Sequence, residues 1–220
     1  MLGGHLDILK WGQKKNLIFP LPTSAAFASD AAHYGHFDIL KYAHENGCHW
    51  DWLVYQKAAM RGHFDIIKYA HENGCPWDSS PCPWDLSTCG CAAANGYFDI
   101  LKYAHENGCP WDSQTCANAA MNGHFDILKY SHENGCPWDS LTSANASMNG
   151  HFDVLKYVHQ NGCPWSVDTC HHVLQSNNIE MLRWITEHGC PWNKDTCLEI
   201  ARRGDFELMA LARSKGCFDY

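Results

Sequence analysis

One short phrase recurs along this chain of 220 residues, and it constrains the fold more than any other feature. The clearest copy reads GHFDILKYSHENGCPW and runs from Gly123 to Trp138. The last five copies begin at residues 96, 123, 150, 177 and 204, so that each interval between them is 27 residues. Weaker copies begin at residues 4, 35 and 62. A fixed period of this length is typical of a solenoid, in which each unit packs only against its neighbours.

Residues 112–138 illustrate the helix pair that we expect in each repeat. Asp112 can cap a short first helix, SQTCANAAM, because its side-chain oxygen can accept a free backbone N–H. Gly123 allows a tight turn, and HFDILKYSHEN then has the apolar spacing of an amphipathic second helix. Gly135 ends that helix, and Pro137 prevents its continuation. Two such short helices cannot bury both faces alone, so we expect successive pairs to stack.

The string AAMNGHFDILKYSHENGC at residues 119–136 resembles the ankyrin repeat, with its paired alanines, Gly-His turn, amphipathic second helix and final glycine. The ankyrin period is about 33 residues with a T-P-L-H-x-A opening, whereas here the period is 27 and the opening is QTCANAA at residues 114–120. GCPWD stands where ankyrin proteins project a β-hairpin finger. The chain is similar to the short ankyrin-like repeats of large DNA viruses of amoebae.

This resemblance implies an all-α, ankyrin-like helix-turn-helix solenoid with shortened or absent β-hairpin fingers. We predict a single repeat solenoid over residues 1–220, which opens with a half-repeat at residues 1–16. Seven helix pairs follow at about 23–47, 50–74, 85–108, 113–135, 140–162, 167–189 and 194–216. The half-repeat leaves an apolar edge open, which predicts a longer parent protein, a covering partner or self-association. The apolar stretch LIFPLPTSAAF at residues 17–27 is a candidate cover within the chain.

Composition argues against several classes of function. Hydrophobic residues are 45% of the chain, which argues against disorder, and no apolar run approaches the roughly 20 residues that span a bilayer. The formal net charge is −8 without a basic stripe, so we expect neither nucleic-acid binding nor docking on an anionic membrane. The N-terminus lacks the apolar core of a secretory signal. We therefore expect an intracellular setting, in the cytoplasm or nucleus and with an infected host cell as one candidate, where the 13 cysteines are free thiols.

Cysteine spacing invites a metal or redox interpretation. Most repeats hold two cysteines seven residues apart: Cys82 and Cys89, Cys109 and Cys116, Cys163 and Cys170, and Cys190 and Cys197. Zinc needs four N or S ligands in a tetrahedron, and the pattern fails at Ser143, seven residues after Cys136. We interpret the cysteines as small buried apolar residues and predict no metal site and no cofactor. A metal- or redox-responsive protein is the alternative function.

Histidine and tryptophan also recur with the repeat. One histidine position of the second helix is occupied by His44, His71, His105, His132 and His159, and another row follows the turn glycine at His36, His63, His124 and His151. The tryptophan row is Trp50, Trp77, Trp111, Trp138, Trp165 and Trp192. A catalytic histidine acts once, beside an acid or base, so we predict hydrogen bonds and ring packing between adjacent repeats. A pH-sensitive stack is a further hypothesis, because histidine titrates near neutral pH.

No motif in the chain points to catalysis. The sequence has no phosphate-cradling GxxxxGK[ST], no HExxH and no GxSxG. We therefore predict no enzymatic activity and no catalytic residue. The ankyrin resemblance instead implies a scaffold for protein–protein interaction.

Function is expected where the repeats differ. One difference is a duplication, CPWDSSP at residues 75–81 followed by CPWD at residues 82–85. Only one of Trp77 and Trp84 can occupy the tryptophan row, so we take Trp84 as a candidate anchor for a partner.

The outer positions of the first helices vary as well, and in the ankyrin family this helix lines the concave binding surface. Exposed methionine and aromatic side chains suit adaptable protein contacts. We predict a protein partner, with a host protein as one candidate, held on this face. The predicted partner-binding residues are Trp52, Gln56, Met60, Arg61, Trp84, Gln114, Asn118, Met121, Asn145, Met148, His171 and Gln175.

Overall fold

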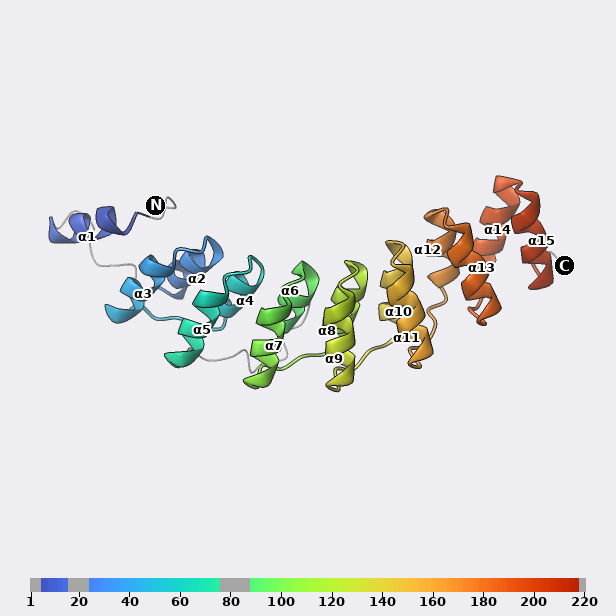
Figure 1. The fold of residues 1–220 in the computed structure, drawn as a ribbon. Coiled ribbons are helices and arrows are strands. Elements are labelled where there is room, and N and C mark those ends of the chain that lie inside the picture. The colour runs from blue at the N-terminus through green and yellow to red at the C-terminus, as the bar shows by residue number, and fades with distance from the viewer. Residues whose placement is uncertain (1–4, 16–23, 76–87, 218–220) are drawn as a thin grey trace. The chain divides into compact units, whose positions relative to one another are not determined.

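The computed structural model describes residues 5–15, 24–75 and 88–217. Across these ranges it contains 15 short helices and no strand, which confirms the predicted all-α helix-turn-helix repeat without β-hairpin fingers (Figure 1). No helix in the same ranges has the length and apolar character to cross a membrane. Trp77, Cys82 and Trp84 and most of the segment at residues 17–27 lie outside the described residues.

Contacts divide the chain into two compact units, residues 1–115 and 116–220, so the single solenoid over the whole chain stays a prediction. The first unit begins with α1 (Leu6–Lys14). Three helix pairs follow: α2 (Ala25–His33) with α3 (Phe37–Glu45), α4 (Leu53–Ala59) with α5 (Phe64–Glu72), and α6 (Thr88–Asn95) with α7 (Phe98–Glu106). The first helices α2, α4 and α6 pack in succession, and the second helices α3, α5 and α7 do the same.

The second unit repeats this arrangement, with the boundary between the units falling inside α8. Its helices are α8 (Ser113–Met121), α9 (Phe125–Glu133), α10 (Ser140–Met148), α11 (Phe152–Gln160), α12 (Thr169–Gln175), α13 (Ile179–Glu187), α14 (Lys194–Arg203) and α15 (Phe206–Ser214). First helices α10, α12 and α14 pack in succession, and second helix α9 packs on α11. Each pair therefore buries its inner faces against the next pair in the unit.

Caps set the bounds of these helices. The Asp112 carboxylate accepts a hydrogen bond from the Gln114 backbone N–H at 3.1 Å, which confirms the predicted cap at the start of α8. Asp139 does the same for Leu141 at 2.9 Å, at the start of α10. Gly135 has a φ of +84° after α9, the left-handed conformation predicted for the stop.

The turn glycine between paired helices is needed for space as well as for its backbone conformation. Gly123 has a φ of +71°, and a Cβ added there would lie 2.5 Å from Nδ1 of His151 in the next repeat. Gly35 has the same φ, and its added Cβ would lie 2.5 Å from Cε1 of His63. His63 and His151 therefore pack directly on the turn glycine of the preceding repeat, which gives these two histidines a structural role.

Candidate protein-interaction face

The predicted partner-binding residues of the first unit that the structure describes lie on α4 and at both of its ends. Trp52 precedes this helix and Met60 follows it, and both side chains are half-buried, whereas Arg61 is exposed. Nη2 of Arg61 lies 3.3 Å from Nε2 of His33 at the end of α2. Burial, followed by the positive charges of Arg61 and Lys57, lowers the pKa of His33. A neutral His33 can accept the guanidinium N–H, and this contact joins the ends of two neighbouring first helices.

Two exposed methionines mark the corresponding place in the second unit. Met121 ends α8 with 37% of its surface exposed, and Met148 ends α10 with 47% exposed. The Asn149 side chain donates to the Met121 carbonyl at 2.8 Å, and a ring nitrogen of His151 lies 3.1 Å from the same oxygen. The Met121 carbonyl at the end of α8 is therefore held by the following repeat. We call Met121, Met148 and their bonded neighbours Asn149 and His151 the methionine edge.

Other predicted residues of the second unit lie elsewhere on the first helices α8 and α12. Gln114 and Asn118 on α8 are half-buried. On α12, Gln175 is exposed and its amide nitrogen lies 2.9 Å from Nε2 of the half-buried His171, one helical turn away. Leu141 is 40% exposed and lies two turns before Met148 on α10. A partner can therefore contact Gln175 and Leu141 more fully than the half-buried side chains.

Two of the predicted residues are buried, and the prediction that their side chains face a partner is wrong. Gln56 is 3% exposed and Asn145 is 4% exposed. The Asn145 side chain donates to the Ala117 carbonyl at 3.0 Å, so it ties α10 to α8. The helix α4 packs between α2 and α6, and α10 packs on α12 and is hydrogen-bonded to α8, so less of each helix surface is free than helical spacing alone indicates.

The histidine and tryptophan rows contact the next repeat, as predicted: Trp50, for example, packs edge to face on Tyr69 with ring centroids 5.9 Å apart. Histidines of the row also stack on the tryptophan six residues later in their own repeat. His44 stacks on Trp50 with ring centroids 3.7 Å apart, and its Nδ1 lies 3.0 Å from the Tyr69 hydroxyl of the next repeat. His71 and the Tyr103 hydroxyl repeat this contact, also at 3.0 Å. Stacked pairs in the second unit are His132 with Trp138 and His159 with Trp165.

Comparison with known proteins agrees with this geometry. Residues 55–105 match the family model described as ankyrin repeats in many copies. This segment of the chain contains ankyrin repeats. A solved structure, the human ASB11 ankyrin repeat domain, has a TM-score of 0.63 and 17% sequence identity, over 74% of this chain and 83% of that chain. No relative was found among curated proteins by sequence. The TM-score shows a shared fold, and ankyrin repeats are general modules of protein–protein interaction.

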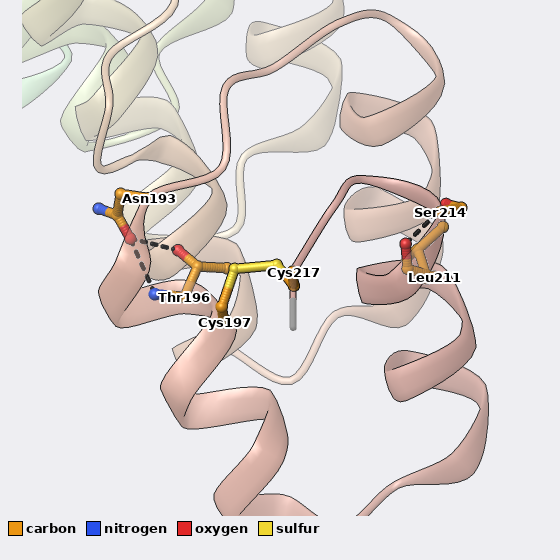
Figure 2. Close-up of a disulfide and its surroundings, with 6 residues drawn as sticks. All are labelled: Asn193, Thr196, Cys197, Leu211, Ser214 and Cys217. Carbon is orange, nitrogen blue, oxygen red and sulfur yellow. Dashed lines mark hydrogen bonds between the residues drawn. A yellow bond between two sulfur atoms is a disulfide. The ribbon is translucent and has the colours of Figure 1, made fainter. Parts of the chain in front are cut away.

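In the last two repeats, cysteines come together at a sequence separation that the sequence interpretation did not consider. Cys197 and Cys217 form a disulfide (Figure 2). The bond joins α14 to the segment that follows α15. Sγ of Cys170 lies 3.1 Å from Sγ of Cys190. Both pairs are separated by 20 residues, because each hairpin folds its last residue back onto its own first helix. The prediction that all thiols are free is therefore wrong for Cys197 and Cys217.

The other described cysteines are buried, as the apolar interpretation predicted. Burial raises the pKa of Cys75 and of Cys163 to about 12, so both are protonated at neutral pH. The hydrogen bond to Cys190, together with burial, also raises the pKa of Cys170. Within the described ranges, no group of three or more His, Cys, Asp or Glu side chains is placed to hold a metal ion.

A pocket of about 300 Å³ lies between α13 and α15. At an inner junction of the same unit, Phe125 packs edge to face on the Tyr157 ring of the next repeat, with centroids 5.3 Å apart. At the last junction the equivalent residues are Ile179 and Leu211, and both line the pocket. Aliphatic side chains thus leave a volume that aromatic rings fill at the inner junction.

Sequence reasoning missed the pairing of cysteines and this pocket for the same reason. Both depend on which residues of one hairpin or of adjacent repeats face each other. The 20-residue separation of Cys170 and Cys190, and the change from aromatic residues to Ile179 and Leu211, were present as signals in the repeat alignment.

Proposed function

We propose that this ankyrin-repeat chain is a protein-interaction scaffold that holds its partner on the exposed ends of the first helices. The observation that carries the proposal is the methionine edge, where Met121 and Met148 are exposed on two neighbouring first helices. Exposed large apolar side chains at fixed positions are the kind of anchor on which protein interfaces depend.

The backbone beneath the methionine edge is fixed while its side chains stay adaptable. Asn145 and Asn149 each donate to a carbonyl of α8, at 3.0 and 2.8 Å, so α8 and α10 hold a set distance. Methionine has three rotatable bonds and a polarisable sulfur, which lets it fit an irregular apolar surface. A rigid edge with adaptable contacts reduces the entropy lost when a partner binds.

Met60 and Arg61, directly after α4, form the equivalent surface of the first unit in this proposal, and Trp52 at the start of α4 is a separate contact point. Arginine, methionine and tryptophan are residue types enriched at protein interfaces. Arg61 also bonds His33, so the group is held by two successive repeats. Trp84 remains a proposed anchor and lies outside the described residues.

The finer setting is part of the same proposal. We place the protein in the cytoplasm or nucleus, with a host protein as the partner, because its short repeats resemble those of large DNA viruses of amoebae. We propose no enzymatic role, since proteins of the ankyrin family are typically scaffolds, and no nucleic-acid partner, since the net charge is −8. Self-association through α1 is retained as a proposal because Ile8 and Trp11 are 61% and 55% exposed.

Affinity capture with a paired variant tests the scaffold. The full chain and a Met121→Ala, Met148→Ala variant are immobilised and exposed to host extract, and the recovered proteins are quantified. Val167→Ala is the matched control, because Val167 is 61% exposed and apolar but belongs to the loop before α12. We expect specific partners to be recovered at least tenfold less by the double variant and undiminished by the control. Equal recovery by all three forms would show that the methionine edge is not the binding face.

A further inference from the structure

The last two repeats place their cysteine pairs at equivalent positions. Cys170 and Cys190 precede Cys197 and Cys217 by one 27-residue period each. The later pair is a disulfide with its Cα atoms 5.7 Å apart, inside the range that disulfides require. In the earlier pair, Cys170 donates a hydrogen bond to Cys190 with the sulfur atoms 3.1 Å apart. The same hairpin geometry therefore presents two thiols to each other where the next repeat has a covalent bond.

We propose that Cys170 and Cys190 are an oxidisable dithiol, which a small peroxide converts to a second disulfide that closes the α12–α13 hairpin. Nothing in the scaffold function requires this bond, so the proposal is independent of the methionine edge. A pair of facing thiols distinguishes this hairpin from the one before it, where Ser143 stands opposite Cys163. There the Ser143 hydroxyl donates to the Pro164 carbonyl at 2.9 Å, and a disulfide cannot form.

Hydrogen peroxide is the two-electron oxidant in this reaction. Cys190 is 4% exposed and Cys170 is fully buried, so we place the first step at Cys190. Its sulfur attacks one peroxide oxygen, the O–O bond breaks, and the leaving hydroxide takes the thiol proton as water, which leaves a sulfenic acid on Cys190. The Cys170 sulfur then attacks the Cys190 sulfur, the S–O bond breaks, and the second hydroxide leaves as water with the Cys170 proton. Two thiols and one peroxide thus become one disulfide and two waters.

The new bond would lower the equilibrium constant for opening of the α12–α13 hairpin. Closing a loop of 20 residues removes chain entropy from the open state, and the expected reduction in the opening equilibrium is about 100-fold. Because α12 also carries His171 and Gln175, oxidation would hold these two side chains more firmly at the surface.

Disulfide mapping of the full chain tests the dithiol. The fully reduced protein is titrated with hydrogen peroxide until the Cys197–Cys217 bond has formed, remaining thiols are alkylated, and linked peptides are identified by mass spectrometry. We expect a Cys170–Cys190 link at the same dose and a 100-fold slower amide exchange in α12 and α13. Cys170→Ser should lose both effects and still fold, because serine occupies the equivalent position 143.

A gain of bonding provides the complementary variant. Ser143→Cys places a thiol opposite Cys163, and we expect peroxide to link position 143 to Cys163 in this variant, whereas Cys163 stays alkylatable in the parent chain. Recovery of Cys170 and Cys190 as alkylated thiols or as sulfinic acids, once Cys197–Cys217 has formed, would overturn the proposal. An exchange rate in α12 and α13 that falls equally in Cys170→Ser would overturn the claim that this bond closes the hairpin.

Discussion

The inner repeats of the second unit and its last repeat share one helix hairpin but are held together by different chemistry. Between the repeats of α9 and α11, aromatic rings interlock: Phe125 packs on Tyr157, and Trp138, which stacks on His132 of its own repeat, also packs edge to face on Tyr157. Between α13 and α15 the rings give way to Ile179 and Leu211 and a pocket, while a disulfide closes the final hairpin. The repeat phrase thus fixes the backbone, and packing between neighbours varies with the side chains that each junction receives.

The final hairpin has further contacts at its second helix. Asp205 caps α15 by accepting from the Glu207 and Leu208 backbones at 2.9 and 3.1 Å. Arg183 pairs with Glu207 across the junction at 2.6 Å. Exposed ion pairs contribute little individually, about 0–1 kcal/mol, so caps and the disulfide are the stronger substitutes for the missing rings.

The largest effect that separates these regions is expected at the turn glycines. Gly123→Ala should lower the free energy of unfolding by about 1–2 kcal/mol because alanine disfavours the left-handed backbone. It should lose about 1–3 kcal/mol more because the new Cβ meets the His151 ring. Gly204 has a similar φ of +65° but no atom within 4 Å of an added Cβ, so Gly204→Ala should cost only the backbone part. Chemical unfolding of both variants measures the difference.

This comparison has an outcome that would contradict it. Equal losses of unfolding free energy in Gly123→Ala and Gly204→Ala would show that the His151 ring moves aside without cost. Since His151 also contacts the Met121 carbonyl, a true steric effect at Gly123 should also weaken partner capture by the methionine edge, whereas Gly204→Ala should leave capture unchanged.

The turn glycines also show what could be predicted from sequence. Period, helix bounds and stops follow from local rules, which is why the pattern of Gly123, Gly135 and Pro137 was sufficient to predict the helix pair. The burial of Gln56 and Asn145 could not be predicted in this way, because helical spacing does not say how much of a first helix its two neighbours cover. Which cysteines face each other depends likewise on how each hairpin closes. The sequence pattern pairs cysteines seven residues apart, whereas the contact joins Cys170 and Cys190, which are 20 residues apart in sequence.

A smaller effect is expected from filling the last junction. Replacing Ile179 by Phe and Leu211 by Tyr restores the ring pair of the inner junctions in a pocket of about 300 Å³. An edge-to-face pair contributes about 0.5–1.5 kcal/mol beyond its buried area, so the double variant should be more stable than the parent by about 1 kcal/mol. Thermal unfolding measures this gain, and each single variant serves as a control because one ring without its partner should give less than half of it. A double variant that is less stable than the parent would show that the pocket cannot accommodate both rings.

The smallest expected difference between the regions is in their response to pH. Burial lowers the pKa of His44, His105 and His159 in the folded chain, with the nearby charges of Glu45 and Glu106 opposing this shift at the first two and His188 adding to it at the third. The unfolded chain therefore binds protons more readily, so this contribution to stability is complete above pH about 6.5 and is lost as the pH falls through the lowered folded pKa values.

At the equivalent positions the last two repeats carry Thr186 and Arg213, which do not titrate in this range. We therefore expect the melting temperature of the parent to fall modestly between pH 7.5 and 5.5, and a His44→Gln, His105→Gln, His159→Gln variant to fall less. Comparable losses in both forms would assign the pH response to groups outside this histidine row. Because glutamine lacks the imidazole ring that stacks on Trp50, the variant should already be less stable at pH 7.5, so the slope with pH, rather than the absolute melting temperature, carries the test.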